Sequence, residues 1–215
     1  MPSKYVLRDF KQNGYYHVIN YGVDKRVVFV DDEDYRTFLY YLKIYLLPKK
    51  FLEEKMPNLP KRMLSKNRNN DVEMIAYTLM PNHFHMLLRE KEVGGISLFM
   101  RQLSNAYTKY FNERHNRSGS LFEGPFKAAG VKNGDMTQVV RYIHLNSFLA
   151  GLVDDPEKYR WSDFPTYTNS KEVNISNNTE ILSQFNTPAD YKHFVHNYMD
   201  YAEKVKTLDG ILIDN

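Results

Sequence analysis

The chain has 215 residues, enough for one well-filled hydrophobic core, so we predict a single domain with appendages. Hydrophobic residues make up 42% and aromatic residues 14% of the sequence, which indicates a folded globule and not a disordered chain. The absence of cysteine excludes disulfides, thiolate metal ligands and a cysteine nucleophile. The net charge of +3 is only mildly basic, and no apolar run is long enough to span a membrane. We therefore expect a cytoplasmic protein without membrane association.

The first third of the chain predicts a strand, a helix and a basic segment. Residues 15–20 are rich in β-formers and follow Gly14, which is typical of a strand. Residues 31–47 open with acidic side chains and repeat apolar residues at the helical period until Pro48 interrupts the pattern. Residues 48–70 contain three prolines and seven Lys or Arg residues, and we interpret them as a basic insertion or loop.

A strand hairpin and further helices follow. Residues 72–80 and 83–89 read as two strands, and Pro81 and Asn82 between them suit the centre of a tight turn. Beyond the hairpin we predict a helix at 96–114, an irregular strand at 122–131, a helix at 136–152 and a terminal helix at 188–206. This order predicts an α+β fold: a ferredoxin-like, split βαβ antiparallel sheet with its helices on one face.

Two histidines stand directly after the predicted turn. His83 and His85 are two apart in a strand, so their side chains share one face, and together they could chelate a divalent metal ion. Two ligands are seldom enough for a catalytic metal site, because such sites usually have three protein ligands. The alternative is a pair of hydrogen-bonded strand histidines with no metal.

The helix at 136–152 offers the residues that could complete such a site. Tyr142 and Asn146 are four apart and share one helix face, and an amide oxygen is a suitable ligand for a hard cation. A phenol beside a cation becomes a plausible nucleophile for a phosphodiester. The alternatives are a core aromatic residue and a surface amide. Tyr107 and Tyr110 are rival nucleophiles, although they lie on the apolar stripe of the preceding helix.

Four blocks carry a resemblance to a known family. They are "YYHVINYGVDKRVVFVDDEDY", "AYTLMPNHFHMLLRE", "LSNAYTKYFNERHNRSGSLFEGPFKAAGV" and "VVRYIHLNSFLAGLV", followed by "YRWSDF". Together they resemble the single-tyrosine HUH transposases of bacterial insertion sequences and, among these, the REP-associated tyrosine transposases. The resemblance implies a catalytic domain at residues 1–167, with 48–70 as a basic insertion, and a C-terminal tail with a terminal helix at 168–215. One departure is Ser147, where the family commonly has proline.

The resemblance also implies a chemistry and a set of ligands. His83, His85 and Asn146 would hold Mg²⁺ or Mn²⁺, and Tyr142 would attack single-stranded or hairpin DNA to form a 5′-phosphotyrosine bond. Some relatives donate the tyrosine across a homodimer and others act as monomers, so both remain open. Two further alternatives are a catalytically silent DNA-binding regulator of the same descent and a phosphodiesterase that uses activated water. We expect phosphate contacts from seven basic residues, namely Arg101, Lys109, Arg114, Arg117, Lys127, Lys132 and Arg141.

Overall fold

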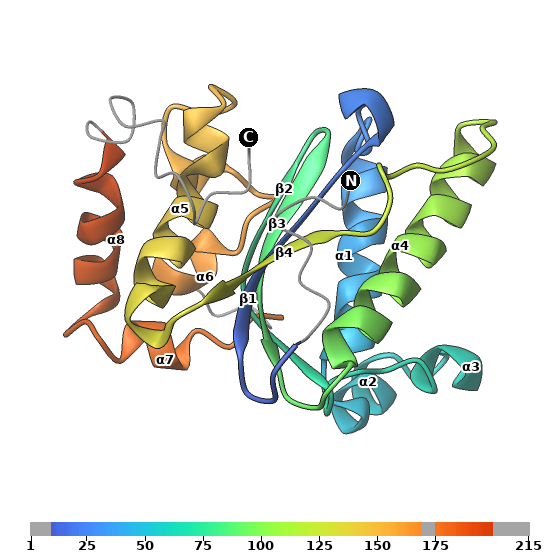
Figure 1. The fold of residues 1–215 in the computed structure, drawn as a ribbon, viewed down its shortest axis with the longest axis horizontal. Coiled ribbons are helices and arrows are strands. Elements are labelled where there is room, and N and C mark those ends of the chain that lie inside the picture. The colour runs from blue at the N-terminus through green and yellow to red at the C-terminus, as the bar shows by residue number, and fades with distance from the viewer. Residues whose placement is uncertain (1–9, 169–174, 200–215) are drawn as a thin grey trace.

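A four-stranded antiparallel sheet forms the centre of the molecule (Figure 1). The computed structural model describes residues 10–168 and 175–199. The strands run in the order β2-β3-β1-β4, so the two inner strands are the first and the third of the chain. This is the strand order of a ferredoxin-like split βαβ sheet, and the predicted α+β class is confirmed. The strands are β1 (Tyr15–Tyr21), β2 (Val72–Met80), β3 (His83–Glu90) and β4 (Lys127–Val131).

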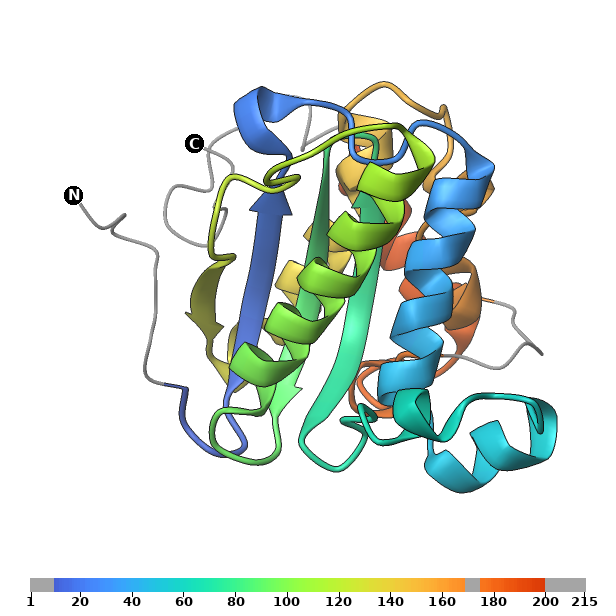
Figure 2. The same ribbon diagram turned by 90° about the vertical axis from the view of Figure 1, so that its right-hand side faces the viewer.

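Two long helices, α1 (Asp32–Leu46) and α4 (Gly95–Arg114), pack side by side on one face of the sheet (Figure 2). The side chain of Asp31 accepts hydrogen bonds from the backbone N–H groups of Glu33 and Asp34, which caps the first turn of α1. The α4 helix follows Gly94, whose φ of +86° is a conformation that glycine adopts without steric cost. Both helices bury their apolar stripes against alternate residues of the strands.

The opposite face of the sheet is also covered, which corrects the prediction of helices on one face only. Helix α5 (Met136–Leu149) packs there against Tyr15, Ile75 and Leu87, and α8 (Pro188–His196) packs on α5 (Figure 1). Both inner strands carry apolar residues on each of their faces, so one layer of helices would leave apolar surface in water. The remaining helices on this side are α6 (Phe164–Thr168), α7 (Thr179–Leu182) and α8 (Pro188–His196).

The basic segment 48–70 is not a simple loop. It forms two short helices, α2 (Lys49–Lys55) and α3 (Lys61–Leu64), which start directly after Pro48 and Pro60. Proline is tolerated at the beginning of a helix, where no N–H donor is required, so these prolines start helices instead of interrupting them. Leu52 and Leu59 are buried against the α1 side of the core, which anchors the segment.

Some predicted boundaries also shift. The last strand begins at Lys127 and not at residue 122, and Phe122 makes only an isolated bridge with Gly22. In place of the terminal helix that the sequence predicts at 188–206, the structure has α8 ending at His196, and residues 200–206 lie outside the described part. Short 3-10 turns complete the connections: η1 (Val23–Lys25), η2 (Asn133–Asp135) and η3 (Pro156–Lys158).

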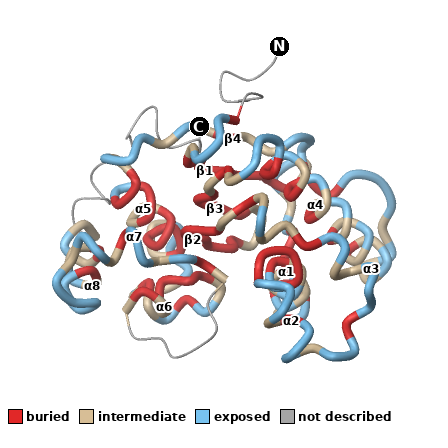
Figure 3. The backbone as a smooth tube through the Cα atoms, turned by 90° about the horizontal axis from the view of Figure 1, so that it is seen from below, coloured by how far each residue is buried: buried red, intermediate tan, exposed pale blue. Residues whose placement is uncertain are grey.

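The most buried residues lie along the strands and on the inward sides of the helices (Figure 3). The division of the chain at residue 167 stays a prediction. However, Ile181, Tyr191 and Val195 from the following segment are fully buried in the same apolar cluster as α5. In the part of the chain that the structure describes, no helix combines the length and the apolarity required to cross a bilayer.

Candidate active site

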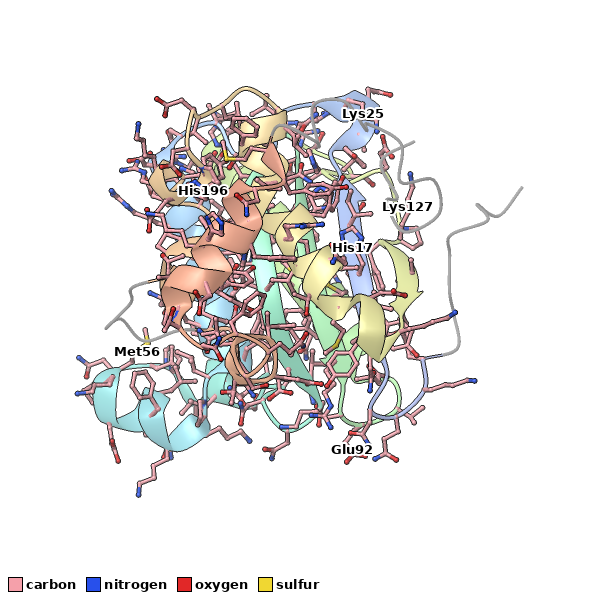
Figure 4. All side chains as sticks on the ribbon, turned by 90° about the vertical axis from the view of Figure 1, so that its left-hand side faces the viewer. His17, Lys25, Met56, Glu92, Lys127 and His196 are labelled. Carbon is pink, nitrogen blue, oxygen red and sulfur yellow. The ribbon has the colours of Figure 1, made fainter. Side chains whose placement is uncertain are left out.

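Three imidazoles meet on the face of the sheet that α5 covers. His83 and His85 share this face of β3, and His17 reaches it from the adjacent strand β1. The Nε2 atom of His83 lies 3.0 Å from Nε2 of His85, and Nδ1 of His85 lies 3.0 Å from Nε2 of His17. His17 and His85 are fully buried. Figure 4 shows His17 on β1 beside α5.

Burial favours the neutral form of the His83 and His85 rings. It lowers the pKa of His83 to about 4, with a smaller contribution from the charge of Lys25. Burial also lowers the pKa of His85 far below its usual range, and the neighbouring His83 and His17 add to this effect. A neutral imidazole has one unprotonated nitrogen, which is the form that binds a metal ion.

The spacing of the two Nε2 atoms fits one shared cation. In an octahedral Mg²⁺ site the ligands lie about 2.1 Å from the metal, so adjacent ligand atoms are about 3.0 Å apart. The observed separation between His83 and His85 is 3.0 Å. Within the described residues, no cluster of three or more His, Cys, Asp or Glu side chains could hold a metal. An amide oxygen is a further ligand type that a hard divalent cation accepts.

Tyr142 on α5 lies against the same imidazoles. Its ring meets that of His85 edge-on at a centroid distance of 5.7 Å and that of His17 at 6.0 Å. Tyr142 is only partly buried, so a substrate can approach it. The rival Tyr107 is fully buried and donates a hydrogen bond to the Val28 carbonyl at 2.6 Å. Burial raises the pKa of Tyr107 far above its usual range, which makes it unsuitable as a nucleophile.

Tyr110, the other rival, lies on the opposite side of the sheet. Its hydroxyl donates to Asp34 at 3.2 Å within the packing of α1 against α4. Burial, followed by the nearby charge of Asp34, raises its pKa. The structure therefore separates both rivals from the imidazoles.

Asn146 follows Tyr142 by one helical turn. Because α5 starts at the end of the sheet where Tyr15 pairs with Val131, it runs toward the His83 end. The four residues from Tyr142 to Asn146 advance about 6 Å along the helix, and the two residues from His85 to His83 advance about 7 Å along the strand. Because Tyr142 lies beside His85, Asn146 therefore lies close to the level of His83. Asn146 as a residue is 7% exposed, and its Nδ2 atom has no hydrogen-bond partner. The amide oxygen, and not this nitrogen, is the atom of Asn146 that could bind a hard cation.

A buried hydrogen-bond network holds α5 in place. His144 is two residues from both Tyr142 and Asn146, so it points to the other side of the helix. Its Nε2 lies 3.0 Å from Oδ1 of Asp163, and its Nδ1 lies 2.7 Å from the hydroxyl of Tyr191. Asp163 also accepts a hydrogen bond from the backbone N–H of Tyr77 on β2. The network thus links α5, α8 and the sheet.

The seven predicted phosphate contacts do not form one surface. Lys127 and Lys132 lie in and directly after β4, on the side of the sheet that leads into α5. Lys127 and Lys25 both approach the ring of Tyr21, which stacks on His83. Arg101 and Lys109 are exposed on α4, which covers the other face.

The remaining three arginines make internal contacts. Arg114 forms ion pairs with Asp31, Glu33 and Asp34 that join α4 to α1. Arg117 bonds Asn112 and the Ser120 carbonyl and so shapes the loop after α4. The guanidinium of Arg141 lies over two rings of the C-terminal segment, those of Phe194 and Tyr198.

Comparisons with known proteins agree with this fold. Residues 11–146, more than half of the chain, match the family model of IS200-like transposases. The structure is similar to that of a REP-associated tyrosine transposase bound to a REP hairpin, with a TM-score of 0.53 and 16% sequence identity. The match covers 81% of this chain and 91% of that chain. No curated protein matches the sequence significantly.

The sheet and the family match together define a DNA transposase. The chain belongs to the IS200-like transposase family, whose members are enzymes that cleave and rejoin DNA, so the resemblance inferred from the four sequence blocks is confirmed.

The structure adds two residues to the site that sequence reasoning did not include. They are His17, which contacts His85, and Asn82, whose Oδ1 lies 2.6 Å from Nδ1 of His83. Asn82 was recognised only as a turn residue. A histidine in the first predicted strand was visible in the sequence, but its proximity to the pair depends on β1 lying next to β3.

Proposed function

We propose that this transposase is a metal-dependent endonuclease and strand transferase for single-stranded DNA, with Tyr142 as the nucleophile and Mg²⁺ or Mn²⁺ as the cofactor. The observation that carries the proposal is the edge-on contact of the Tyr142 ring with His85, whose Nε2 lies 3.0 Å from that of His83. The proposed nucleophile Tyr142 thus contacts one of the two imidazoles that would bind the metal. The ligands are His83, His85 and Asn146.

The chemistry follows from these positions. When bound, a divalent cation would neutralise charge on the oxygens of the scissile phosphate. The hydroxyl of Tyr142 loses its proton and attacks phosphorus, a new phosphorus–oxygen bond to tyrosine forms, and the bond to the 3′ oxygen breaks as that oxygen takes up a proton. The products are a 5′-phosphotyrosine and a free 3′-OH. Attack of a 3′-OH on the phosphotyrosine reverses the step and joins strands without an external energy source.

We infer that the DNA partner is a single strand or a hairpin. The similar structure is described as bound to a REP hairpin. Lys127, whose ammonium lies 5.7 Å from the Tyr21 ring that stacks on His83, supplies positive charge near the imidazoles, and Lys132 lies in the connection between β4 and α5. Tyr142 contacts a histidine of its own chain, which supports cleavage by the tyrosine of the same subunit in a monomer or a dimer.

A covalent adduct tests the proposal. We expect end-labelled single-stranded hairpin DNA with Mn²⁺ to form a protein–DNA adduct that survives denaturation, and Tyr142→Phe to abolish it. The matched control is Tyr110→Phe, which removes a partly buried hydroxyl that makes a hydrogen bond on the other face and should leave the adduct intact. The readout is a gel-shifted labelled band that disappears after protease treatment.

Other outcomes of the same assay identify the alternatives. Cleavage by Tyr142→Phe without an adduct would indicate attack by activated water. Binding of the hairpin by the wild-type protein without cleavage would indicate a silent regulator. Either result would contradict the proposed phosphotyrosine chemistry.

A further inference from the structure

The hydrogen bond between Asn82 and His83 determines where His83 carries its proton. The Nδ2 atom of Asn82 donates to the Lys25 carbonyl at 3.3 Å, so its Oδ1 is the atom that faces His83 at 2.6 Å. An amide oxygen only accepts, so Nδ1 of His83 must be the donor. Nε2 of this neutral ring is therefore unprotonated and able to bind a cation.

When no cation is present, the proton position on His83 also determines the proton positions on His85 and His17. Nε2 of His83 can only accept, so Nε2–H of His85 donates to it across 3.0 Å. Nδ1 of His85 is then unprotonated and accepts from Nε2–H of His17, also at 3.0 Å. The hydrogen bonds point in one direction, from His17 through His85 and His83 to Asn82, and each ring holds one proton.

A cation shared by the two Nε2 atoms is incompatible with this arrangement, because Nε2 of His85 carries a proton. For His85 to become a ligand, its proton must reside on Nδ1, and Nε2 of His17 lies 3.0 Å from that atom. His17 must then accept through Nε2 and carry its own proton on Nδ1. The change involves three protons. The proton on Nε2 of His17 moves to Nδ1 of His85, the proton on Nε2 of His85 leaves, and Nδ1 of His17 takes up a proton. The number of protons does not change.

We propose that His17 is a positioning residue that selects the metal-binding tautomer of His85, as Asn82 does for His83. This inference rests on the proposed function, because it assumes that the two Nε2 atoms hold a cation. The roles of the two partners differ in one respect. Asn82 holds His83 permanently in the ligand form, whereas His17 can exist as donor or acceptor and must change tautomer when the cation binds.

Substitution of His17 gives the first test. Loss of a hydrogen-bond partner to a metal-binding histidine typically lowers metal affinity about 10- to 100-fold. We expect His17→Phe, which keeps a ring but offers no acceptor, to weaken Mn²⁺ binding by such a factor in calorimetric titration of the full chain. His17→Gln can present an amide oxygen to His85, as Asn82 does to His83, and should recover most of the affinity. Rescue by glutamine is a result that a purely structural role would not produce.

A control and a second measurement complete the test. The control is Tyr15→Phe, because Tyr15 lies two residues before His17 on the same strand face. The substitution removes the Tyr15 hydroxyl, which donates a hydrogen bond to Glu180 and does not contact the three rings. The variant should bind Mn²⁺ like the wild type. The second measurement requires no variant: imidazole ¹⁵N NMR spectra of the wild-type protein report which ring nitrogen carries the proton. With Mg²⁺ we expect the proton of both His17 and His85 to move from Nε2 to Nδ1, while His83 keeps its proton on Nδ1.

The outcomes distinguish the two proposals. A His85 proton that moves to Nδ1 while the His17 tautomer stays unchanged with bound Mg²⁺, or wild-type Mn²⁺ affinity in folded His17→Phe, would overturn the role of His17 and leave the metal site intact. A His85 proton that stays on Nε2 with bound Mg²⁺ would overturn both the role of His17 and the shared binding of the cation by the two Nε2 atoms. A wild-type protein that binds neither cation would overturn both this inference and the proposed metal-dependent function.

Discussion

At the scale of single residues, the amide of Asn146 is the clearest test of the proposed ligand set. Its Nδ2 atom is buried without a hydrogen-bond partner, so removing the amide costs the fold little. We expect Asn146→Ala to weaken Mn²⁺ binding in calorimetric titration, with a free energy of unfolding in urea close to that of the wild type. A variant that loses stability but keeps its Mn²⁺ affinity would show that the amide serves packing instead.

The neighbouring His144 illustrates the opposite case, a polar residue whose partners are all internal. Asp163 accepts from His144 and from the Tyr77 backbone in a site with no solvent exposure. We expect Asp163→Ala to lower the free energy of unfolding by about 1–3 kcal/mol for each donor left unsatisfied. Urea denaturation at neutral pH measures this loss, and a change no larger than that of an exposed alanine substitution would contradict it. The variant should retain Mn²⁺ binding wherever it stays folded.

At the scale of elements, the contact between α1 and α4 depends on charge. Arg114 on α4 lies 2.8 Å from Asp31, the residue that caps α1, and 2.7 Å from the buried Asp34. Its hydrogen bond to Asp31 lowers the pKa of that carboxyl from 3.8 to about 2. The sequence indicated a DNA contact for Arg114, whereas the structure gives it partners within the fold.

The lowered pKa of Asp31 predicts a pH dependence of stability. A carboxyl with a lower pKa in the folded state stabilises the fold when ionised, so its contribution is complete above the unfolded pKa and is lost as the pH falls from about 4 to about 2. Asp31→Asn keeps an oxygen that can cap α1 but removes the charge. We expect urea denaturation to show a wild-type advantage above about pH 5 that shrinks toward about pH 2. An advantage that grows on acidification would refute this assignment.

At the scale of the whole molecule, the sheet separates the basic residues into two groups. Lys127 lies over the Tyr21 ring beside His83 and Lys132 lies in the connection from β4 to α5, whereas Arg101 and Lys109 lie on α4 beyond the other face. A single strand held near Tyr142 can contact the first group without reaching the second.

We therefore expect Lys127→Ala and Lys132→Ala to weaken single-stranded DNA binding, each reducing the slope of log affinity against log salt by about 0.7. Arg101→Ala and Lys109→Ala serve as matched controls and should leave both quantities unchanged. Fluorescence anisotropy at several salt concentrations measures them. Equal losses from the two groups would mean that DNA passes over both faces.

Local periodicity explains how much of the fold and of the candidate site could be predicted. The repeat of two along a strand places His83 and His85 on one face, and the repeat of 3.6 along a helix does the same for Tyr142 and Asn146. These relations hold within a single element, so they require no knowledge of its neighbours. The hairpin at Pro81 and Asn82 is equally local, and the structure confirms it.

The sequence by itself determined the α+β order of elements, the strand hairpin and the two candidate residue pairs. Only the tertiary structure decided that β1 lies beside β3, which brings His17 to His85, and that α5 covers the second face, which brings Tyr142 to both. It also decided that Arg114 pairs with carboxylates while Lys127 lies over the Tyr21 ring beside His83. These outcomes depend on which distant surfaces bury each other most completely, and that is a property of the whole packed chain which no local pattern records.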